Sequence, residues 1–269
     1  MSANAAAEEQ KSGVAGELQR CNILGVGVHA INMDLAVDTL ERAVESREKG
    51  YVCVTGVHGI MEAQRDHSLR STLNRSLLTT PDGMPTVWVG RWYGQSHMDR
   101  VYGPDMMLEV CRRSVAKGYT HFFYGGNTGV AEELKSSLTE KFPGLRVVGT
   151  YTPPFRPLND RERSDLQATV AQCRPDFFWV GLSTPKQERF MAEYLPLLDA
   201  TVMCGVGAAF DVHTGRIQDS PRWVKRSGLQ WAHRLFQEPR RLGRRYLVNN
   251  PKFMFAITSQ ILGFRRTPV

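Results

Sequence analysis

The chain has 269 residues, of which 42% are hydrophobic and 23% are charged, and these proportions exclude a disordered or fibrous protein. The net charge of +7 is unevenly placed, because the segment from Arg216 onward holds 12 Lys and Arg against two Asp and Glu. Residues 1–215 therefore carry about −3. Five widely spaced cysteines give no disulfide framework or metal-ligand spacing, and no run approaches the roughly 20 apolar residues of a membrane span.

The first 20 residues, rich in Ala, Glu and Gln, predict a flexible tail and lack the apolar stretch of a signal peptide. The segment Gly25–Ala30 matches the G-x-G-x-x-G/A pattern of dinucleotide-binding loops. Its context is poor, because only Ile23 and Leu24 precede it as a strand and the next strand exit offers Thr55 instead of a ribose-binding acid. An ordinary first strand or hairpin is the preferred interpretation, and an NAD-dependent oxidoreductase remains an alternative.

Short β-rich runs then alternate with helical patterns. Strands are expected at Tyr51–Val57, Ser76–Thr79, His121–Tyr124, Leu145–Thr150, Phe177–Gly181 and Thr201–Gly205. Helices are expected at Met33–Lys49, Gly59–Arg70, Asp105–Lys117, Thr128–Phe142, Asp160–Cys173 and Lys186–Leu197. Asn32 and Asn127 suit helix N-caps, and Gly50 and Gly118 suit C-caps. The alternation predicts a Rossmann-like α/β fold, with a mostly parallel sheet and helices on both faces.

Five of the expected strand exits combine glycine or proline with polar residues. These exits are Thr55–Gly59, Thr80–Gly83, Gly125–Gly129, Gly181–Glu188 and Gly205–Asp211. Glycine and proline are common in any turn, so a single exit carries little weight. Ligands of open α/β sheets bind beyond the carboxyl ends of the strands, and five such exits together favour one shared pocket.

Three of these exits carry candidate chemistry. Asp82 can serve as a general base at the end of a strand, although the pattern alone favours an N-cap of the helix that begins near Met84, or a routine Pro-Asp-Gly turn. The amides of Gly125–Gly129 open a helix and suit a pyrophosphate, or form a plain turn. Gln187 and Glu188 can bind sugar hydroxyls or simply complete the first turn of a helix.

The stretch Pro221–Tyr246 is basic, aromatic and helical in pattern. Tryptophan, leucine and phenylalanine beside several arginines suit the headgroup region of an anionic membrane. A terminal helix packed on the core, with a solvated basic face, explains the same pattern equally well. The apolar piece Phe253–Phe264 can pack or enter the interface but is too short to span a bilayer. No binding module accompanies the charge, so nucleic acid is not expected as a partner.

An ordered series of short motifs resembles the WecG/TagA/CpsF glycosyltransferase family from about Asn22 to Leu247. The motifs are Thr80–Gly83, Phe123–Gly126, Pro143–Thr150, Pro185–Glu188, Gly205–Asp211, Pro221–Val224 and Gln237–Arg241. The resemblance implies a metal-independent, inverting enzyme without a cofactor, which moves a sugar from a UDP-sugar to a polyprenyl-diphosphate-linked sugar. It also implies action at the cytoplasmic face of the plasma membrane, in the synthesis of surface polysaccharide or teichoic acid precursors.

Carried over by position, the resemblance makes Asp82 the catalytic base that deprotonates the acceptor hydroxyl. The substrate-binding residues that it implies are Thr55, His58, Gly83, Asp105, Gly125, Gly126, Asn127, Lys186, Gln187, Glu188, Gly205, Gly207 and Asp211. Asp105 is expected as a helix N-cap beside the pocket. Arginines expected at the acceptor diphosphate or the membrane are Arg222, Arg226, Arg234, Arg240 and Arg241, and Arg222 or Arg226 is predicted to approach a diphosphate.

The predicted organisation is a tail over residues 1–20, a catalytic α/β domain over 21–215 and a basic C-terminal appendage over 216–269. Many family members read Thr-Pro-Asn where this chain has Thr55-Gly56-Val57, so the transferred sugar stays open. The oligomeric state also stays open, with a homo-oligomer among the possibilities. A non-enzymatic, basic lipid-binding protein is the remaining alternative, and it predicts binding that does not depend on Asp82.

Overall fold

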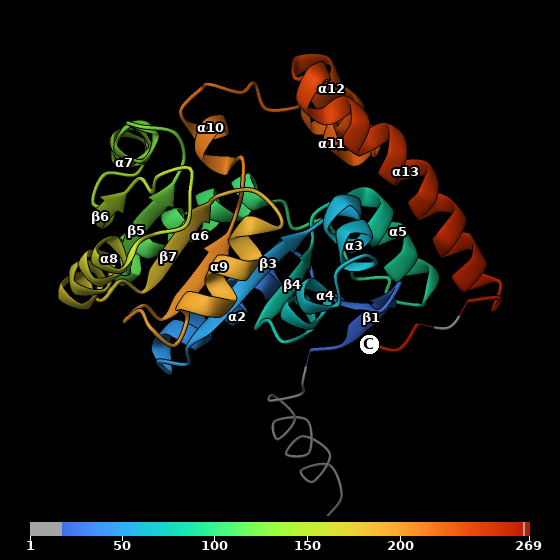
Figure 1. Ribbon diagram of the computed structural model, residues 1–269, viewed down its shortest axis with the longest axis horizontal. Helices are drawn as coiled ribbons and strands as arrows, with labels where there is room; N and C mark the ends of the chain where they lie inside the picture. The colour runs from blue at the N-terminus through green and yellow to red at the C-terminus, as the bar shows by residue number, and fades with distance from the viewer. Residues whose placement is uncertain (1–17, 266) are drawn as a thin grey trace, which may run out of the picture.

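A six-stranded parallel sheet forms the centre of the computed structural model, which describes residues 18–265 and 267–269 (Figure 1). In spatial order its strands are β4 (Leu78–Pro81), β3 (Gly50–Thr55), β8 (Val202–Gly205), β7 (Phe177–Gly181), β5 (Thr120–Gly125) and β6 (Arg146–Tyr151). Every strand pair of this sheet is parallel. The expected α/β fold is confirmed.

A separate antiparallel hairpin precedes the sheet. It joins β1 (Arg20–Ile23) to β2 (Val26–His29), and its two turn residues, Leu24 and Gly25, both have positive φ. Positive φ at both positions is the geometry of the tightest hairpin turns, and glycine adopts it without strain. The hairpin interpretation of Gly25–Ala30 is confirmed. The segment that matched the dinucleotide-binding pattern therefore belongs to a β-hairpin, and it no longer supports the NAD-dependent alternative.

The helices cover both faces of the sheet. They are α2 (Met33–Glu45), α3 (Val57–Ala63), α4 (His67–Asn74), α5 (Met84–Trp92), α6 (Gly103–Lys117), α7 (Val130–Lys141), α8 (Asp160–Cys173), α9 (Lys186–Tyr194), α10 (Ala209–His213), α11 (Arg222–Arg226), α12 (Gln230–Gln237) and α13 (Pro239–Ile261). Two apolar cores result, because successive strand residues point to opposite faces. Phe178 and Val180 of β7 pack under α3, α4, α8 and α9, whereas Phe177 and Trp179 pack under α2, α6 and α7.

Several expected boundaries were wrong for local reasons. The first helix ends at Glu45, and Gly50 opens β3 rather than capping that helix. The helix expected over Gly59–Arg70 is two helices, because the Asp66 side chain accepts hydrogen bonds from Ser68 N and Leu69 N and starts a new one. Gly129, not Asn127, is the N-cap of α7. The caps at Asn32 and Gly118 are confirmed.

The C-terminal helices return to the beginning of the chain. Phe253, Ala256 and Ile257 of α13 are buried in the same core as α3, so this helix packs on the sheet domain. Further on, Gln260 Nε2 donates to the carbonyl of Asn22 at 2.8 Å, and Gln260 Oε1 accepts from Leu24 N at 2.9 Å. None of the helices in the described residues is both long and apolar enough to cross a membrane.

Candidate active site

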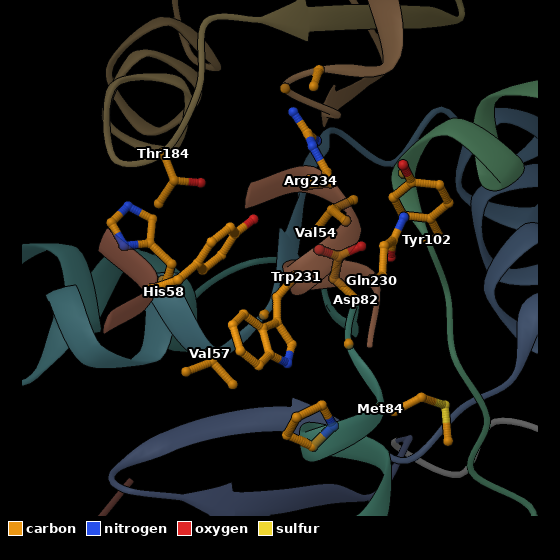
Figure 2. Close-up of a pocket in the computed structure, with 18 of the residues that line it drawn as sticks. Val54, Val57, His58, Asp82, Met84, Tyr102, Thr184, Gln230, Trp231 and Arg234 are labelled. Atoms are coloured by element: carbon orange, nitrogen blue, oxygen red, sulfur yellow. The ribbon is translucent and has the colours of Figure 1, made fainter. Parts of the chain in front are cut away.

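A cavity of about 460 Å³ lies beyond the carboxyl ends of β3, β4 and β8, where α11, α12 and α13 cover it (Figures 1 and 2). This size is within the usual range for ligand sites. We call it the first cavity. Its polar lining includes His58, Asp82, Arg100, Tyr102, Gln187, Lys225, Gln230, Arg234, Arg241 and Arg245. The sheet domain supplies the carboxylate of the site, and the C-terminal helices supply four of its five Lys and Arg residues.

Asp82 sits where β4 ends. Its backbone N–H donates to the carbonyl of Thr55 at 3.2 Å, which joins the exits of two neighbouring strands. Gly83 is the N-cap of α5, so the Asp82 side chain does not serve as the cap and faces the cavity. Atom Oδ1 of Asp82 is buried and has no hydrogen-bond partner among the described residues. Burial raises the pKa of this carboxyl, although the charges of Arg100, Arg234 and Arg245 oppose the shift.

Arg100 links Asp82 to the C-terminal helices. Its Nε donates to the backbone carbonyl of Asp82 at 2.6 Å, and its Nη2 donates to Oε1 of Gln230 at the start of α12. The guanidinium also lies over the ring of Tyr102, 4.1 Å from its centroid. Lys225 of α11 approaches the same ring at 4.8 Å and forms ion pairs with Asp105 (3.0 Å) and Asp219 (2.6 Å).

Cationic groups approach the cavity from α12 and α13. Glu238, between the two helices, pairs with Arg234 at 3.0 Å and with Arg241 at 2.6 Å, and so holds both guanidiniums in place. In the described part of the chain, the buried Nε atoms of Arg234 and Arg245 lack hydrogen-bond partners. Buried N–H groups of this kind suit an anionic ligand.

A second cavity, of about 720 Å³, lies beyond the exits of β5, β6 and β7. Its polar lining includes Asn127, Arg156, Arg163, Lys186, Arg189, Glu193, Asp211, Glu238 and Arg241. Ser183, Gly207, Ala208 and Arg241 line both cavities, so the two are adjacent. Ser183 has a φ of 69°, a conformation that favours glycine, and such strain is common at functional sites.

Gln187 and Glu188 begin α9 at this junction. Glu188 Oε1 accepts from the Thr184 hydroxyl at 2.8 Å and from Gln187 Nε2 at 3.2 Å. Gln187 Oε1 is buried at the cavity wall with no hydrogen-bond partner in the described part of the chain. Glu188 thus fixes the Gln187 amide so that its carbonyl oxygen is available to a donor group of a ligand. Burial raises the pKa of Glu188.

His58 lies in the wall opposite Tyr102, beside Thr184 (Figure 2). Its Nδ1 accepts from the Asn249 amide at 3.1 Å, so α13 contributes to its orientation. Burial and the nearby charge of Arg245 lower the pKa of His58 to about 4. The neutral imidazole can therefore form hydrogen bonds at neutral pH without adding charge.

The structure brings most of the predicted site residues to the two cavities and leaves some outside. The first cavity contains His58, Asp82, Gly83, Gln187, Gly205, Gly207, Arg234 and Arg241, and the second contains Gly126, Asn127, Lys186, Gly207, Asp211 and Arg241. The predicted residues outside both described linings are Thr55, Asp105, Gly125, Glu188, Arg222, Arg226 and Arg240.

Each outlying residue has a structural explanation. Thr55 is buried, and its hydroxyl donates to the carbonyl of Cys53 at 3.2 Å. Gly125 is needed because any Cβ there would meet the Gly181 backbone at 2.7 Å. Asp105 is not the N-cap of α6, since Tyr102 occupies that position, and it pairs with Lys225 instead. Arg222, Arg226 and Arg240 are exposed.

Five cavity residues were not predicted from the sequence: Arg100, Tyr102, Lys225, Gln230 and Arg245. Asp105 was predicted near the pocket but Tyr102 was not, although an aromatic ring before Gly-Pro was a usable signal. For Lys225 and Arg245 the sequence offered no means of choosing among twelve basic residues, because helix phase relative to the cavity decides which ones point inward.

Comparison with known proteins decides the family. Residues 21–267 match the model of the "Glycosyl transferase WecG/TagA/CpsF family". The chain belongs to this family of glycosyltransferases. It is 26% identical over 230 residues to an N-acetylglucosaminyldiphosphoundecaprenol N-acetyl-beta-D-mannosaminyltransferase of Bacillus subtilis, covering 85% of this chain and 87% of that protein. It is 28% identical over 222 residues to the enzyme of the same name from Bacillus spizizenii, covering 82% and 84%.

Proposed function

We propose that this glycosyltransferase moves a sugar from a UDP-sugar to a polyprenyl-diphosphate-linked sugar, with inversion at the anomeric carbon. The observation that carries the proposal is the buried, unpaired carboxylate oxygen of Asp82 in a cavity whose other Asp, Glu, Lys and Arg residues, in the described lining, are four arginines and Lys225. A lone base beside anion-binding groups suits a transfer in which an alcohol attacks and a diphosphate leaves.

The two cavities suggest separate places for donor and acceptor. The second cavity offers Asn127, Lys186 and Asp211 at strand exits, and this polar surface suits a nucleotide. The acceptor then occupies the first cavity, with its sugar at Asp82. The transferred sugar lies at the junction, beside Ser183, Gly207 and Arg241.

In the proposed step, Asp82 takes the proton of the acceptor hydroxyl as its oxygen attacks the anomeric carbon of the donor. The bond from that carbon to the UDP oxygen breaks at the same time, and UDP leaves with the bonding electrons. A single displacement inverts the anomeric configuration. Arg234 and Arg241, held by Glu238, lie where they can stabilise the charge that develops on the departing diphosphate.

Metal-independent action fits the residues present. Among the described residues there is no cluster of three or more His, Cys, Asp or Glu side chains placed to bind a metal ion. The guanidiniums of α12 and α13 can supply the positive charge instead. We therefore expect transfer to persist in EDTA, and we expect no cofactor requirement.

Peripheral attachment to the cytoplasmic face of the membrane is part of the proposal. Large apolar side chains on the C-terminal helices are exposed, among them Trp223, Phe236, Leu247, Phe255 and Phe264. Exposed arginines accompany them, including Arg222, Arg226 and Arg240. This combination suits the headgroup region of an anionic membrane. We assign residues 216–269 to a membrane-proximal appendage of the catalytic domain on this basis.

The direct test measures UDP release from a panel of UDP-sugars with short-chain lipid-diphosphate acceptors. The names of the Bacillus relatives make N-acetylmannosamine as donor sugar and N-acetylglucosaminyl diphospholipid as acceptor the first pair to assay. We expect acceptor-dependent UDP release that Asp82→Asn abolishes and EDTA does not. Acceptor-independent hydrolysis, or full activity of Asp82→Asn, would contradict the proposal.

A further inference from the structure

Helix α5 presents an apolar stripe to the outside of the sheet domain. Pro85, Trp88 and Trp92 follow one another at helical spacing along one face, while Val87 and Val89 are buried, Val89 in the same core as α3. Trp88 is 51% exposed and Trp92 is 71% exposed. Two neighbouring tryptophans with this exposure are unusual on a protein surface and indicate a contact with another molecule.

This stripe begins inside the first cavity. Pro85 and Trp88 line it together with Met84, and Met254 of α13, which is 57% exposed, lines the facing wall. The α11–α12 connection completes the rim, because the Trp88 ring packs so closely over Gly228 that a Cβ there would lie 2.6 Å from it. The cavity therefore has an apolar mouth between α5 and the C-terminal helices.

The apolar part of the first cavity is lined by Met84, Pro85 and Trp88 of α5 and by Phe253 and Met254 of α13. We call this part of the cavity the α5–α13 groove. Further along the same two segments, Gln260 Nε2 donates to the Tyr93 hydroxyl at 2.9 Å and links α13 to the residue after α5.

Polarity changes along the first cavity in one direction. In Figure 2, Asp82 lies between Arg234 on one side and Trp231 and Met84 on the other. The acceptor class in the proposed function has a matching order, because its sugar hydroxyl, its diphosphate and its hydrocarbon chain follow one another. With the hydroxyl at Asp82 and the donor beyond Arg234, the chain must leave toward Trp231, Met84 and Trp88.

We propose that the α5–α13 groove binds the first isoprene units of the acceptor lipid, with Trp88 as its main contact and with Trp92, one turn further along α5, extending the apolar surface beyond the cavity. The inference rests on the proposed function and adds a lipid subsite formed by the sheet domain. The donor cannot be the occupant of this groove, since a nucleotide sugar has no apolar portion of comparable size. Apolar burial along the groove then favours an acceptor that carries several isoprene units over one that carries a single unit.

The experiment compares two acceptors that share the same sugar-diphosphate head and carry either one isoprene unit or a farnesyl chain. Binding is measured calorimetrically without donor, and KM is measured with donor, for wild type, Trp88→Ala and Trp92→Ala. Leu197→Ala is the matched control, because this exposed leucine lies in the connection between α9 and the amino end of β8, outside the described linings of both cavities. Wild type and control should bind the farnesyl acceptor roughly tenfold more tightly, and the tryptophan variants should lose most of this preference.

A chain-length preference that survives in both tryptophan variants would overturn the inference. In particular, variants that bind anionic phosphatidylglycerol vesicles less well but keep the preference would show that the tryptophans contact the bilayer and not the acceptor chain. Trp92→Ala keeps the test decisive if Trp88→Ala does not fold, because Trp92 is largely exposed. The calorimetric result does not depend on turnover, so failure of the proposed reaction would be seen separately, as binding without UDP release.

Discussion

Arg100 holds the backbone of Asp82: its Nε donates to the Asp82 carbonyl at 2.6 Å, while the other arm of the guanidinium reaches Gln230 of α12. One side chain therefore connects the exit of β4 to the helices that cover the cavity. A change in the packing of α12 can therefore alter the position of Asp82 through Arg100, even where it removes no direct contact with Asp82.

Replacing the base tests its role most directly. We expect Asp82→Asn to lower kcat by about 10²–10⁴-fold and to leave the KM values nearly unchanged, because the amide cannot accept the proton but has the same shape. Steady-state kinetics with a short-chain acceptor measures both values. A matched Asp105→Asn variant, altered at a carboxylate outside both cavities, should keep far more activity. Equal losses in the two variants would contradict the assignment.

The same substitution should change the pH dependence of stability. Burial raises the pKa of Asp82 in the folded state, so the folded protein holds this proton more tightly than the unfolded chain does. Stability from this group is therefore present below the unfolded pKa and decreases as the pH rises through the folded pKa. At neutral pH, Asp82→Asn should be more stable than wild type by on the order of 1 kcal/mol, and the gain should vanish in acid. Thermal unfolding across the acid range measures the difference.

Arg244 and Arg245 are adjacent in α13, so replacing each in turn distinguishes the effect of charge inside the first cavity from the effect of charge on the surface. Arg245 lines the first cavity, whereas its neighbour Arg244 is exposed. We expect Arg245→Gln to lower kcat/KM by about 10–10³-fold through loss of anion stabilisation, and Arg244→Gln to have little effect. A soluble short-chain acceptor removes the contribution of membrane binding. Similar losses in both variants would indicate a general effect of charge.

We expect Lys225 to hold α11, the first of the three helices that cover the first cavity, against α6 of the sheet domain. Its ammonium pairs with Asp105 and Asp219, whereas the next residue, Arg226, is exposed. Lys225→Ala should loosen α11 by about 1 kcal/mol and lower activity, while Arg226→Ala should not. Hydrogen exchange of α11 and α12 measures the local effect directly. Unchanged protection of α11 in Lys225→Ala would show that other contacts hold this helix.

Glu188 is expected to act through Gln187. Glu188→Ala frees the Gln187 amide to rotate, so we expect KM to rise about tenfold with a smaller change in kcat. Glu188→Gln keeps an acceptor oxygen and should restore part of the loss. If both variants lose activity equally and also unfold at lower temperature, the role of Glu188 is structural only.

The sequence was sufficient to predict the α/β fold and to place Asp82 at a strand exit that lines a cavity. Strand exits could be located because β-rich runs and glycine-containing turns are local signals, and the segment Phe177–Gly181 was placed without error. The split between α3 and α4 was missed because it depends on the Asp66 cap, which competes with a continuous helical pattern. The resemblance implied Asp82 as the base, whereas its pattern alone favoured a helix cap, which the structure assigns to Gly83.

The sequence could not show which side chains of the C-terminal helices face the cavity. Arg222 or Arg226 was predicted to approach a diphosphate, but neither belongs to the described lining of a cavity. Of the five arginines that the sequence indicated, Arg234 and Arg241 line the first cavity, and Arg245, which was not predicted, lines it as well. Neighbouring positions on a helix point about 100° apart, so the choice depends on how α12 and α13 pack. That packing is set by contacts far apart in sequence, such as Phe253 against the core that includes α3.

The return of α13 to the hairpin near the start of the chain has a consequence for biosynthesis. A ribosome makes the carboxylate of Asp82 long before it makes Arg234 or Arg245, and α13 can pack only after Phe253 has emerged. A nascent or prematurely terminated polypeptide would thus present an open cleft with Arg100 but without the arginines of α12 and α13. The complete cavity would form only once translation of α13 is finished.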